Sequence, residues 1–327
     1  MTRRVVFVCA AGPSIGGGHV MRSLTLARAL EARSAACAFL ETPEVAAVLD
    51  AFGPDMARTD TTAPFDAVVF DSYALSADHH RAIAKGRPAL VIDDLADRSL
   101  AADLVLDAGP ARRAEDYAGL LPPHARLLLG PNHAPVRPAF VALRETALAR
   151  RAERGPVRRI LVSLGMTDVG GATGRVVALL APILGDIKLD LVVGGAAPSL
   201  PALRALAEAD PRFVLHVDAQ DMPHLVLEAD LAVGAGGSTT WERCVLALPA
   251  LTLILADNQI AAARALEAAG VTPCLDVSAA DFAGAFVALA KSLITDADRR
   301  AALSASSATV CDGRGAGRVA EAVLGLM

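Results

Sequence analysis

A glycine-rich loop that ends in a histidine is the feature of this sequence best suited to chemistry. Residues 12–19 read Gly-Pro-Ser-Ile-Gly-Gly-Gly-His and follow a short apolar run. The glycines let the backbone approach a ligand closely, and imidazole can take a proton from water near neutral pH. His19 is therefore a candidate general base, and Gly17 and Gly18 are candidates for contact with the substrate. The alternative is a histidine that only hydrogen-bonds the loop.

The same loop comes close to the dinucleotide-binding fingerprint GxGxxG. Gly16 and Gly18 have the required spacing, but Met21 occupies the position of the third glycine. Glu41, at the end of the second predicted strand, is a candidate for the acidic residue that binds ribose in such proteins. A nicotinamide or flavin enzyme is therefore an alternative, although one glycine of its fingerprint is missing.

A second glycine loop, at residues 233–242, reads Val-Gly-Ala-Gly-Gly-Ser-Thr-Thr-Trp-Glu. Because it joins a strand to a helix, its backbone amides and hydroxyls can bind a diphosphate. Glu242 lies one turn into the helix and can accept hydrogen bonds from both ribose hydroxyls. Thr239 and Glu242 also fit a capping box, which is the purely structural alternative. The predicted phosphate-binding residues of this loop are Gly236, Gly237, Ser238 and Thr239.

Three other polar segments follow predicted strands, at residues 71–73, 163–168 and 256–259. The carboxyl ends of parallel strands meet at one edge of a sheet, which is where ligands bind in such sheets. Asn258 and Gln259 can orient sugar hydroxyls or a water molecule without carrying charge. The alternative for this pair is a helix cap.

Asp93 and Asp94 form a pair of neighbouring carboxylates that could contribute to a magnesium site. A magnesium ion needs further oxygen ligands, and the sequence identifies none. We therefore expect the pair to order its loop or to orient the substrate, with a metal site as the alternative.

Short apolar runs alternate with amphipathic stretches along the chain, a pattern typical of parallel α/β sheets. The best helix is Val20–Ala32, in which apolar residues recur at helical spacing. The first set of predicted strands is Arg4–Cys9, Ala35–Leu40, Ala67–Phe70, Ala89–Ile92, Leu104–Leu106 and Arg126–Leu129. The second set is Arg159–Leu164, Leu189–Val193, Phe213–Val217, Leu231–Val233 and Ala250–Ile254.

The two sets of strands predict two Rossmann-like domains that face each other across a cleft. Residues 143–159 are rich in arginine and contain Gly-Pro, which indicates a helix followed by a linker. We expect residues 1–150 to form the domain that carries the base and residues 156–308 to form the nucleotide-binding domain. Residues 309–327 would then form a last helix, lying either on the first domain or as a solvated surface helix.

The composition excludes several classes of protein. The chain has 327 residues, is 54% hydrophobic, and carries 31 basic against 36 acidic residues, for a formal net charge of −5. It lacks the basic excess typical of nucleic-acid binding. Its five scattered cysteines form no CxxC pair, which argues against a disulfide framework or a zinc site and predicts a cytoplasmic protein. We expect no signal peptide and no membrane-spanning segment.

Taken together, these motifs resemble those of the nucleotide-sugar hydrolases of pseudaminic acid biosynthesis, which serves flagellin glycosylation in bacteria. The resemblance spans almost the whole chain and implies the two-domain glycosyltransferase-B fold, related to the lipid-II-forming N-acetylglucosaminyltransferase. It also implies release of UDP from UDP-2,4-diacetamido-2,4,6-trideoxy-β-L-altropyranose. The residues that carry it are Gly16-x-Gly-His-x-x-Arg22, Asp71-Ser-Tyr73, Asp93-Asp94, Gly236-Gly-Ser-Thr-Thr-Trp-Glu242, Asn258-Gln259 and Asp312-Gly-x-Gly315.

The resemblance assigns roles to individual residues. His19 would activate a water that attacks the anomeric carbon with inversion, while Tyr73 and Asn258 contact the sugar. The second glycine loop would hold phosphate, Glu242 would hold the ribose, and the uracil would lie against Asp221-Met222. No metal or cofactor is required. Further residues assigned to substrate or UDP binding are Gly17, Gly18, Arg22, Gly165, Asp168, Met222 and Gln259.

Two departures from the family pattern stand out. The family usually has Arg-x-Asp where this chain has Val8-Cys9-Ala10, and two glycines where it has Gly165-Met166. The first departure leaves the identity of the sugar less certain than that of the nucleotide. Two rival functions remain: a glycosyltransferase that uses a UDP-sugar, and a protein that binds nucleotide sugars without turning them over.

Overall fold

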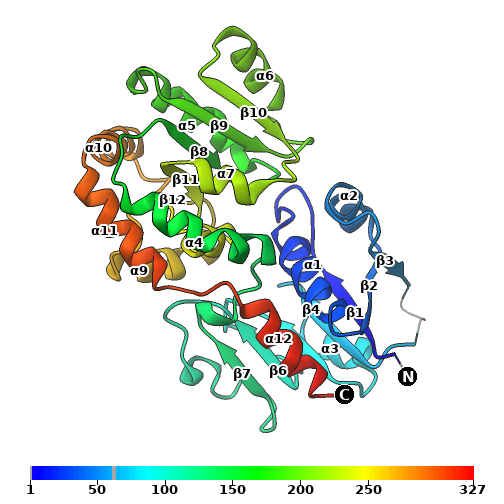
Figure 1. The fold of residues 1–327 in the computed structure, drawn as a ribbon. Coiled ribbons are helices and arrows are strands. Elements are labelled where there is room, and N and C mark those ends of the chain that lie inside the picture. The colour runs from blue at the N-terminus through cyan, green and yellow to red at the C-terminus, as the bar shows by residue number, and fades with distance from the viewer. Residues whose placement is uncertain (1, 61–63) are drawn as a thin grey trace. The chain divides into compact units, whose positions relative to one another are not determined.

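Two compact units make up the chain in this computed structural model, which describes residues 2–60 and 64–327 (Figure 1). Unit 1 consists of Met1–Arg137 and Gly313–Met327, and unit 2 consists of Pro138–Asp312. Each unit is a parallel β-sheet connected by helices. The predicted class, two Rossmann-like α/β units, is confirmed.

Unit 1 contains a seven-stranded sheet in the order β3-β2-β1-β4-β5-β6-β7, with every neighbouring pair parallel. The central strand β4 is buried along its whole length, as expected for a strand covered on both faces. The short edge strand β3 was not predicted, because its three residues show no apolar pattern. The strands are β1 (Arg4–Cys9), β2 (Ala36–Leu40), β3 (Ala57–Thr59), β4 (Ala67–Asp71), β5 (Ala89–Ile92), β6 (Leu104–Asp107) and β7 (Arg126–Leu129).

The last helix of the chain, α12 (Gly315–Leu324), belongs to unit 1 and packs against α1 (Gly18–Glu31). Val319 and Val323 are buried in the same apolar cluster as Leu26 of α1. Gly315 allows the helix to start close to the main chain, because a Cβ there would lie 2.2 Å from the Ala134 carbonyl oxygen. The other helices of unit 1 are α2 (Pro43–Phe52) and α3 (Ala77–Ala84), with 3-10 turns η1 (Ala114–Tyr117) and η2 (Pro131–His133).

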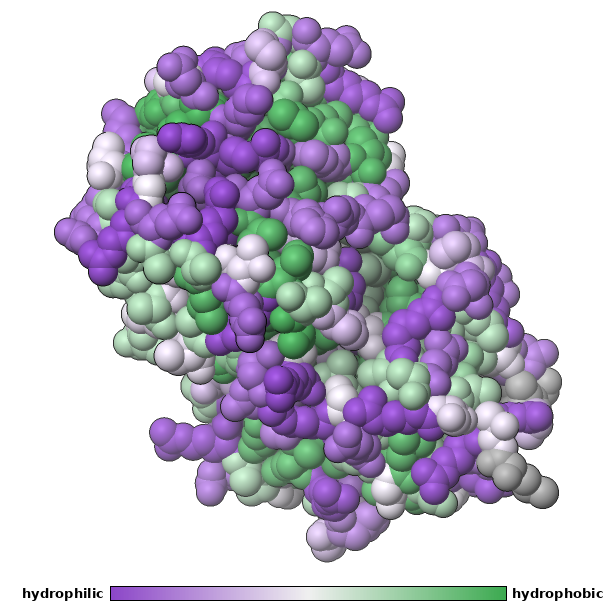
Figure 2. Space-filling model, viewed as in Figure 1, coloured by the Kyte–Doolittle hydropathy of each residue, from purple (hydrophilic) through white to green (hydrophobic). Residues whose placement is uncertain are grey.

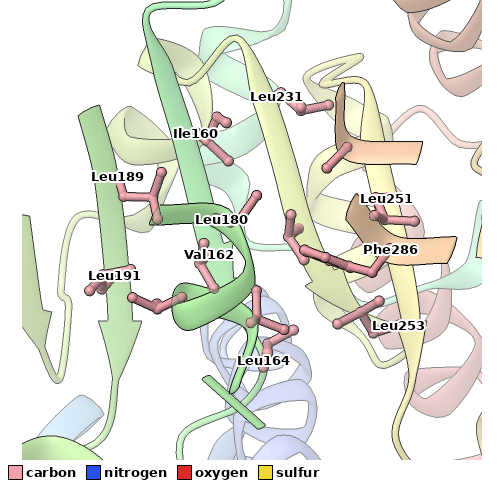
Figure 3. Close-up of a cluster of buried hydrophobic side chains, with 14 of the residues drawn as sticks. Ile160, Val162, Leu164, Leu180, Leu189, Leu191, Leu231, Leu251, Leu253 and Phe286 are labelled. Carbon is pink, nitrogen blue, oxygen red and sulfur yellow. The ribbon is translucent and has the colours of Figure 1, made fainter. Parts of the chain in front are cut away.

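Unit 2 contains a six-stranded parallel sheet in the order β10-β9-β8-β11-β12-β13. Figure 3 shows its core: Val162, Leu191 and Leu253 come from three strands, and Leu180 and Phe286 come from two helices. Full burial of each such side chain stabilises the fold by about 1.5–3 kcal/mol. The strands are β8 (Arg159–Ser163), β9 (Lys188–Val193), β10 (Phe213–Val217), β11 (Leu231–Ala235), β12 (Ala250–Ile254) and β13 (Cys274–Asp276).

Helix α4 (Pro138–Ala152) lies in unit 2, so the boundary between the units falls at Arg137 and not at residue 150. Its arginines explain this, since Arg144 donates to the Val245 carbonyl at 2.6 Å and Arg151 donates to the Ala229 carbonyl at 2.6 Å. The other helices of unit 2 are α5 (Ala172–Leu180), α6 (Leu200–Ala209), α7 (Met222–Glu228), α8 (Thr239–Val245), α9 (Ile260–Ala268), α10 (Phe282–Thr295) and α11 (Ala297–Ala308), with 3-10 turns η3 (Val169–Gly171), η4 (Ala181–Ile183) and η5 (Asp257–Gln259).

Each sheet has one point where the strand order reverses. In unit 1 the chain runs outward from β1 through β2 to the edge strand β3 and then crosses to β4, on the other side of β1. In unit 2 the corresponding neighbours are β8 and β11. The carboxyl ends of two such strands leave a crevice, which is the usual place for a ligand in open parallel sheets. Both glycine loops follow strands that border these points.

The face in Figure 2 carries mostly hydrophilic side chains, with small apolar patches among them. Within the described residues, the large hydrophobic side chains that are strongly exposed are scattered singly, as is normal on protein surfaces. None of the helices built from residues 2–60 and 64–327 is both long and apolar enough to cross a bilayer.

Candidate functional site

The predicted base lies at the reversal point of the unit 1 sheet. Helix α1 begins at Gly18, so His19 stands in its first turn, where only 7% of the residue is exposed. Its Nδ1 contacts a carboxylate oxygen of Asp71, the last residue of β4. The register of the sheet pairs Asp71 with Cys9 at the end of β1, directly before the glycine loop.

Asp71 is completely buried, and its two oxygens accept hydrogen bonds from three neighbouring side chains of α1. Besides His19, Arg22 donates from Nε and Nη2 at 2.7 and 2.6 Å, and Ser23 donates from its hydroxyl at 3.2 Å. Burial by itself would raise the pKa of Asp71, but the positive charge of Arg22 and the contact with His19 hold it at about 2. The carboxylate is therefore ionised at any physiological pH.

The charge on Asp71 decides which nitrogen of His19 carries the proton. An ionised carboxylate can only accept, so its close contact with Nδ1 requires a hydrogen on that nitrogen. Arg22 Nη2 also lies 3.2 Å from Nδ1, but it makes its shorter hydrogen bond, at 2.6 Å, to Asp71 Oδ1. The neutral ring then has its lone pair on Nε2. A histidine held in this way can take a proton at Nε2 from water or from a sugar hydroxyl, with a carboxylate behind it to balance the positive charge that forms.

Tyr73 joins the same cluster through Asp94. The Tyr73 hydroxyl donates to Asp94 Oδ1 at 2.6 Å, and Arg22 Nη1 donates to Asp94 Oδ2 at 3.2 Å. The Tyr73 ring also lies edge-on to the His19 ring, with 4.8 Å between ring centroids. Three predicted site residues, His19, Arg22 and Tyr73, therefore lie together in unit 1.

The two neighbouring carboxylates, Asp93 and Asp94, lie in different environments. Asp93 is buried and accepts from Ala96 N, Arg98 Nη1 and the Tyr117 hydroxyl at 2.8, 2.8 and 2.9 Å, so it orders the loop. Asp94 is half-buried and faces the cluster around His19. In the part of the chain that the structure describes, no group of three histidine, cysteine or acidic residues is placed to bind a metal ion.

The second glycine loop lies at the reversal point of the unit 2 sheet, between β11 and α8. Gly236 N donates to the Leu253 carbonyl at 3.1 Å, and a Cβ on Gly236 would lie 3.2 Å from the Gln259 side chain. A Cβ on Gly237 would meet nothing, so the loop is open to a ligand at that residue. Ser238 and Thr239 are half-buried beside it.

The capping box considered for this loop is not formed in the way the sequence indicated. The cap residue of α8 is Ser238, and its side chain makes no capping hydrogen bond. The Thr239 hydroxyl instead accepts a hydrogen bond from Arg243 Nη1 at 3.2 Å. Glu242 lines a small cavity at the reversal point, together with Thr239 and Met222.

The remaining predicted site residues of unit 2 differ in whether they are accessible to a ligand. Gly165 has a φ of +110°, in the range that favours glycine, and Asn258 is exposed on η5. Asp168 is fully buried, and its Oδ1 accepts from Thr173 N at 2.8 Å, so it orders the turn before α5. Gln259 Oε1 accepts from Leu255 N at 3.0 Å and so supports the end of β12.

The sequence placed Asp71 at the carboxyl edge of the sheet and gave the Asp93-Asp94 pair a loop-ordering or substrate-orienting role, but it did not pair Asp71 with His19. Arg243 was missed altogether. Arg243 gave no such signal, because an arginine inside an amphipathic helix normally extends into solvent.

No protein-family profile matches this chain. Over 143 residues the chain is 31% identical to the "Spore coat polysaccharide biosynthesis protein SpsG" of Bacillus subtilis (strain 168). The match covers 43% of this chain and 41% of that protein, so it spans about two fifths of the curated relative.

Solved structures match over nearly the full length. MurG of Acinetobacter baumannii has a TM-score of 0.65 at 17% identity, covering 99% of each chain. The spinosyn rhamnosyltransferase SpnG, complexed with thymidine diphosphate, has a TM-score of 0.68 at 18% identity, also covering 99% of each chain. This chain has the glycosyltransferase-B fold. At these identities the likeness establishes the fold alone.

Proposed function

We propose that this protein is an enzyme that acts on a nucleotide sugar, and specifically a hydrolase that releases UDP from a UDP-linked diacetamido sugar. The observation that carries the proposal is the His19–Asp71 pair, in which a buried anion leaves Nε2 of the histidine as the base. The sequence motifs favour UDP-2,4-diacetamido-2,4,6-trideoxy-β-L-altropyranose and pseudaminic acid biosynthesis for flagellin glycosylation. The dispersed free thiols fit a cytoplasmic enzyme.

The proposed reaction begins with a water molecule that loses a proton to His19 Nε2. Its oxygen bonds to the anomeric carbon while the bond from that carbon to the UDP oxygen breaks, so the configuration inverts. The electron pair of the broken bond leaves with UDP, and the positive charge formed on His19 is stabilised by Asp71. A base in this position contributes about 10²–10⁴-fold to the rate.

Within this proposal, each unit has its own task. In unit 1, Tyr73 contacts the sugar, and Arg22 holds Asp71 and Asp94 in place. In unit 2, Gly236, Gly237, Ser238 and Thr239 bind the diphosphate, Glu242 binds the ribose, and Asn258 contacts the sugar. The uracil lies against Met222. Three further predicted residues, Gly165, Asp168 and Gln259, support the loops around the nucleotide.

A glycosyltransferase with the same base is the second candidate, and a specific observation favours it. SpnG, which matches this chain over its full length, is a rhamnosyltransferase. In that case His19 would deprotonate a sugar or protein hydroxyl instead of water. A non-catalytic protein that binds nucleotide sugars would use the same residues without turnover.

Incubation with the UDP-linked diacetamido sugar in the absence of any acceptor separates the three functions. A hydrolase releases UDP and free sugar in equal amounts, and the His19→Ala variant does not. Release of UDP only after a hydroxyl acceptor is added would favour the transferase. Tight binding with neither product formed would favour the binding protein.

A further inference from the structure

Arg243 is a buried cation directly beneath the second glycine loop. Only 4% of the residue is exposed, and its guanidinium donates three hydrogen bonds. Nη2 donates to the Ala235 carbonyl at 3.0 Å and to the Thr240 hydroxyl at 3.1 Å, and Nη1 donates to the Thr239 hydroxyl at 3.2 Å. All three acceptors are neutral, and across residues 2–60 and 64–327 Arg243 forms no salt bridge.

The guanidinium stays charged in this position. Burial lowers the pKa of Arg243, but the ordinary pKa of arginine is so high that the group remains protonated near neutral pH. The backbone is shaped to admit it, because a Cβ at residue 234 would lie 2.3 Å from Nη1 and only Gly234 leaves the space. The fold therefore buries a guanidinium that forms no salt bridge among the described residues, and the neighbouring Glu242, which lines the same small cavity, acts on it only through its charge. Burying a cation in this way is costly.

A second buried arginine of unit 2, Arg300, has a purely structural role and can be compared with Arg243. Only 7% of it is exposed, and it too donates only to neutral acceptors: the carbonyls of Leu293, Ile294 and Gly155, at 2.8, 2.9 and 2.8 Å. Two of these carbonyls belong to the last turn of α10, where a cation is favourable. Arg243 instead bonds the hydroxyls of Thr239 and Thr240, the first two residues of α8, directly after the second glycine loop.

Thr239 connects the buried charge to the surface. Its hydroxyl accepts from Arg243 on the buried side, so the one proton of that hydroxyl is available to donate elsewhere. Thr239 is half-buried, next to exposed Gly237. A hydroxyl that accepts from a guanidinium is a stronger donor to an anion, because hydrogen bonds in series polarise one another.

We propose that Arg243 is a positioning residue for the diphosphate of the bound nucleotide: it orients the Thr239 hydroxyl toward the ligand and supplies the positive charge that the diphosphate neutralises. This inference rests on the proposed function. It assigns the loop a preference for anions that does not depend on the uracil or the ribose. Arg243 itself does not touch the substrate.

The test compares UDP with uridine, which lacks the diphosphate, by calorimetric titration of the full chain. Arg243→Met and Thr239→Val should each weaken UDP binding by about tenfold or more, as expected for loss of a charge-assisted hydrogen bond. Uridine binding should stay within about twofold in both variants, because no phosphate contact is involved. The double variant should lose little more than either single one, because both act through the same hydroxyl.

Arg300→Met is the matched control, since it removes a buried, neutrally bonded arginine from the same unit. It should lower the melting temperature and leave the ratio of UDP to uridine affinity unchanged. Arg243→Lys should restore part of the UDP affinity that Arg243→Met loses. If Arg243→Met does not fold, Thr239→Val with Thr239→Ser as its conservative partner decides the matter.

An unchanged ratio of UDP to uridine affinity in Arg243→Met, or in Thr239→Val, would overturn the inference and leave the proposed function standing. If the wild-type protein bound neither UDP nor uridine, both the inference and the proposed function would fail.

Discussion

His19 Nδ1 donates a hydrogen bond to the carboxylate of Asp71, which lies 52 residues further along the chain, at the end of β4. Arg22 and Ser23, from the same helix as His19, hold that carboxylate in place. The proposed base, the anion behind it and the two side chains that support the anion thus come from two elements that meet at the reversal point of one sheet.

His19→Ala should reduce turnover by at least about 10²-fold, the low end of the contribution of a general base. UDP affinity and the melting temperature should change little, because Arg22 and Ser23 still satisfy Asp71. UDP release and UDP binding are measured on the same preparation. His124→Ala is the control, since His124 is an exposed histidine of unit 1 whose Nε2 contacts Asp103. Wild-type turnover in His19→Ala would contradict the assignment of the base.

Asp71→Asn should lower kcat by about 10²–10⁴-fold, because an amide neither fixes the Nδ1–H tautomer nor stabilises the imidazolium. KM should stay nearly constant, because Asp71 is completely buried and is therefore not accessible to a bound substrate. Ser23→Ala removes another hydrogen bond to the same carboxylate and serves as the control, with a small effect expected on both parameters. A change confined to KM would mean that Asp71 acts in substrate binding.

Glu242→Ala should weaken UDP binding by about 1–3 kcal/mol, the value of a hydrogen bond to a charged group. Binding of 2′,3′-dideoxy-UDP should be nearly equal in the wild type and the variant, because that ligand offers Glu242 no ribose hydroxyl. The melting temperature without ligand is measured in parallel. A variant that melts earlier but binds UDP as the wild type does, once corrected for the folded fraction, would indicate a structural role.

The pKa of His80 predicts how the free energy of unfolding depends on pH in the acidic range. Burial, followed by nearby positive charges, lowers the pKa of this histidine to about 4, and its ring packs against Phe70. In the unfolded chain a histidine titrates near pH 6.5, so between about pH 6.5 and 4 the unfolded state binds a proton that the folded state does not. The stability that His80 contributes is therefore complete above this range and is lost as the pH falls.

His80→Gln should flatten this part of the stability curve, removing a loss on the order of 1–3 kcal/mol between pH 7 and pH 4. Urea unfolding of the wild type and the variant at matched pH values provides the measurement. Parallel curves for the two proteins would contradict the origin assigned to the slope.

Most of the strands could be predicted from the sequence, because buried parallel strands are continuous apolar runs. The runs at Arg4–Cys9 and Phe213–Val217 match the observed strands β1 and β10 residue for residue. The short strands β3 and β13 could not be predicted, since three residues carry too little pattern. Helix α4 was placed in the first domain because the sequence shows its arginines but not the carbonyls of unit 2 that they bind.

The candidate site was only partly predictable, for a related reason. His19 and the two glycine loops can be recognised in the sequence, because their residue types are distinctive and each loop directly follows a predicted strand. The pairing of His19 with Asp71 depends on β1 and β4 being neighbours, which is a property of the sheet order and not of local sequence. The capping box that the local pattern indicated does not form, because α8 already begins at Thr239 with Ser238 as its cap residue, and the Thr239 hydroxyl accepts from Arg243 instead.

The central claim is that His19 delivers water to the anomeric carbon of the sugar and that UDP leaves. Running the reaction in ¹⁸O-labelled water, with a metal chelator present, and weighing both products by mass spectrometry tests this directly. The account predicts label on the sugar, none on UDP, and no loss of activity to the chelator. Label on UDP, which would mean attack at phosphorus, or activity abolished by the chelator would contradict it.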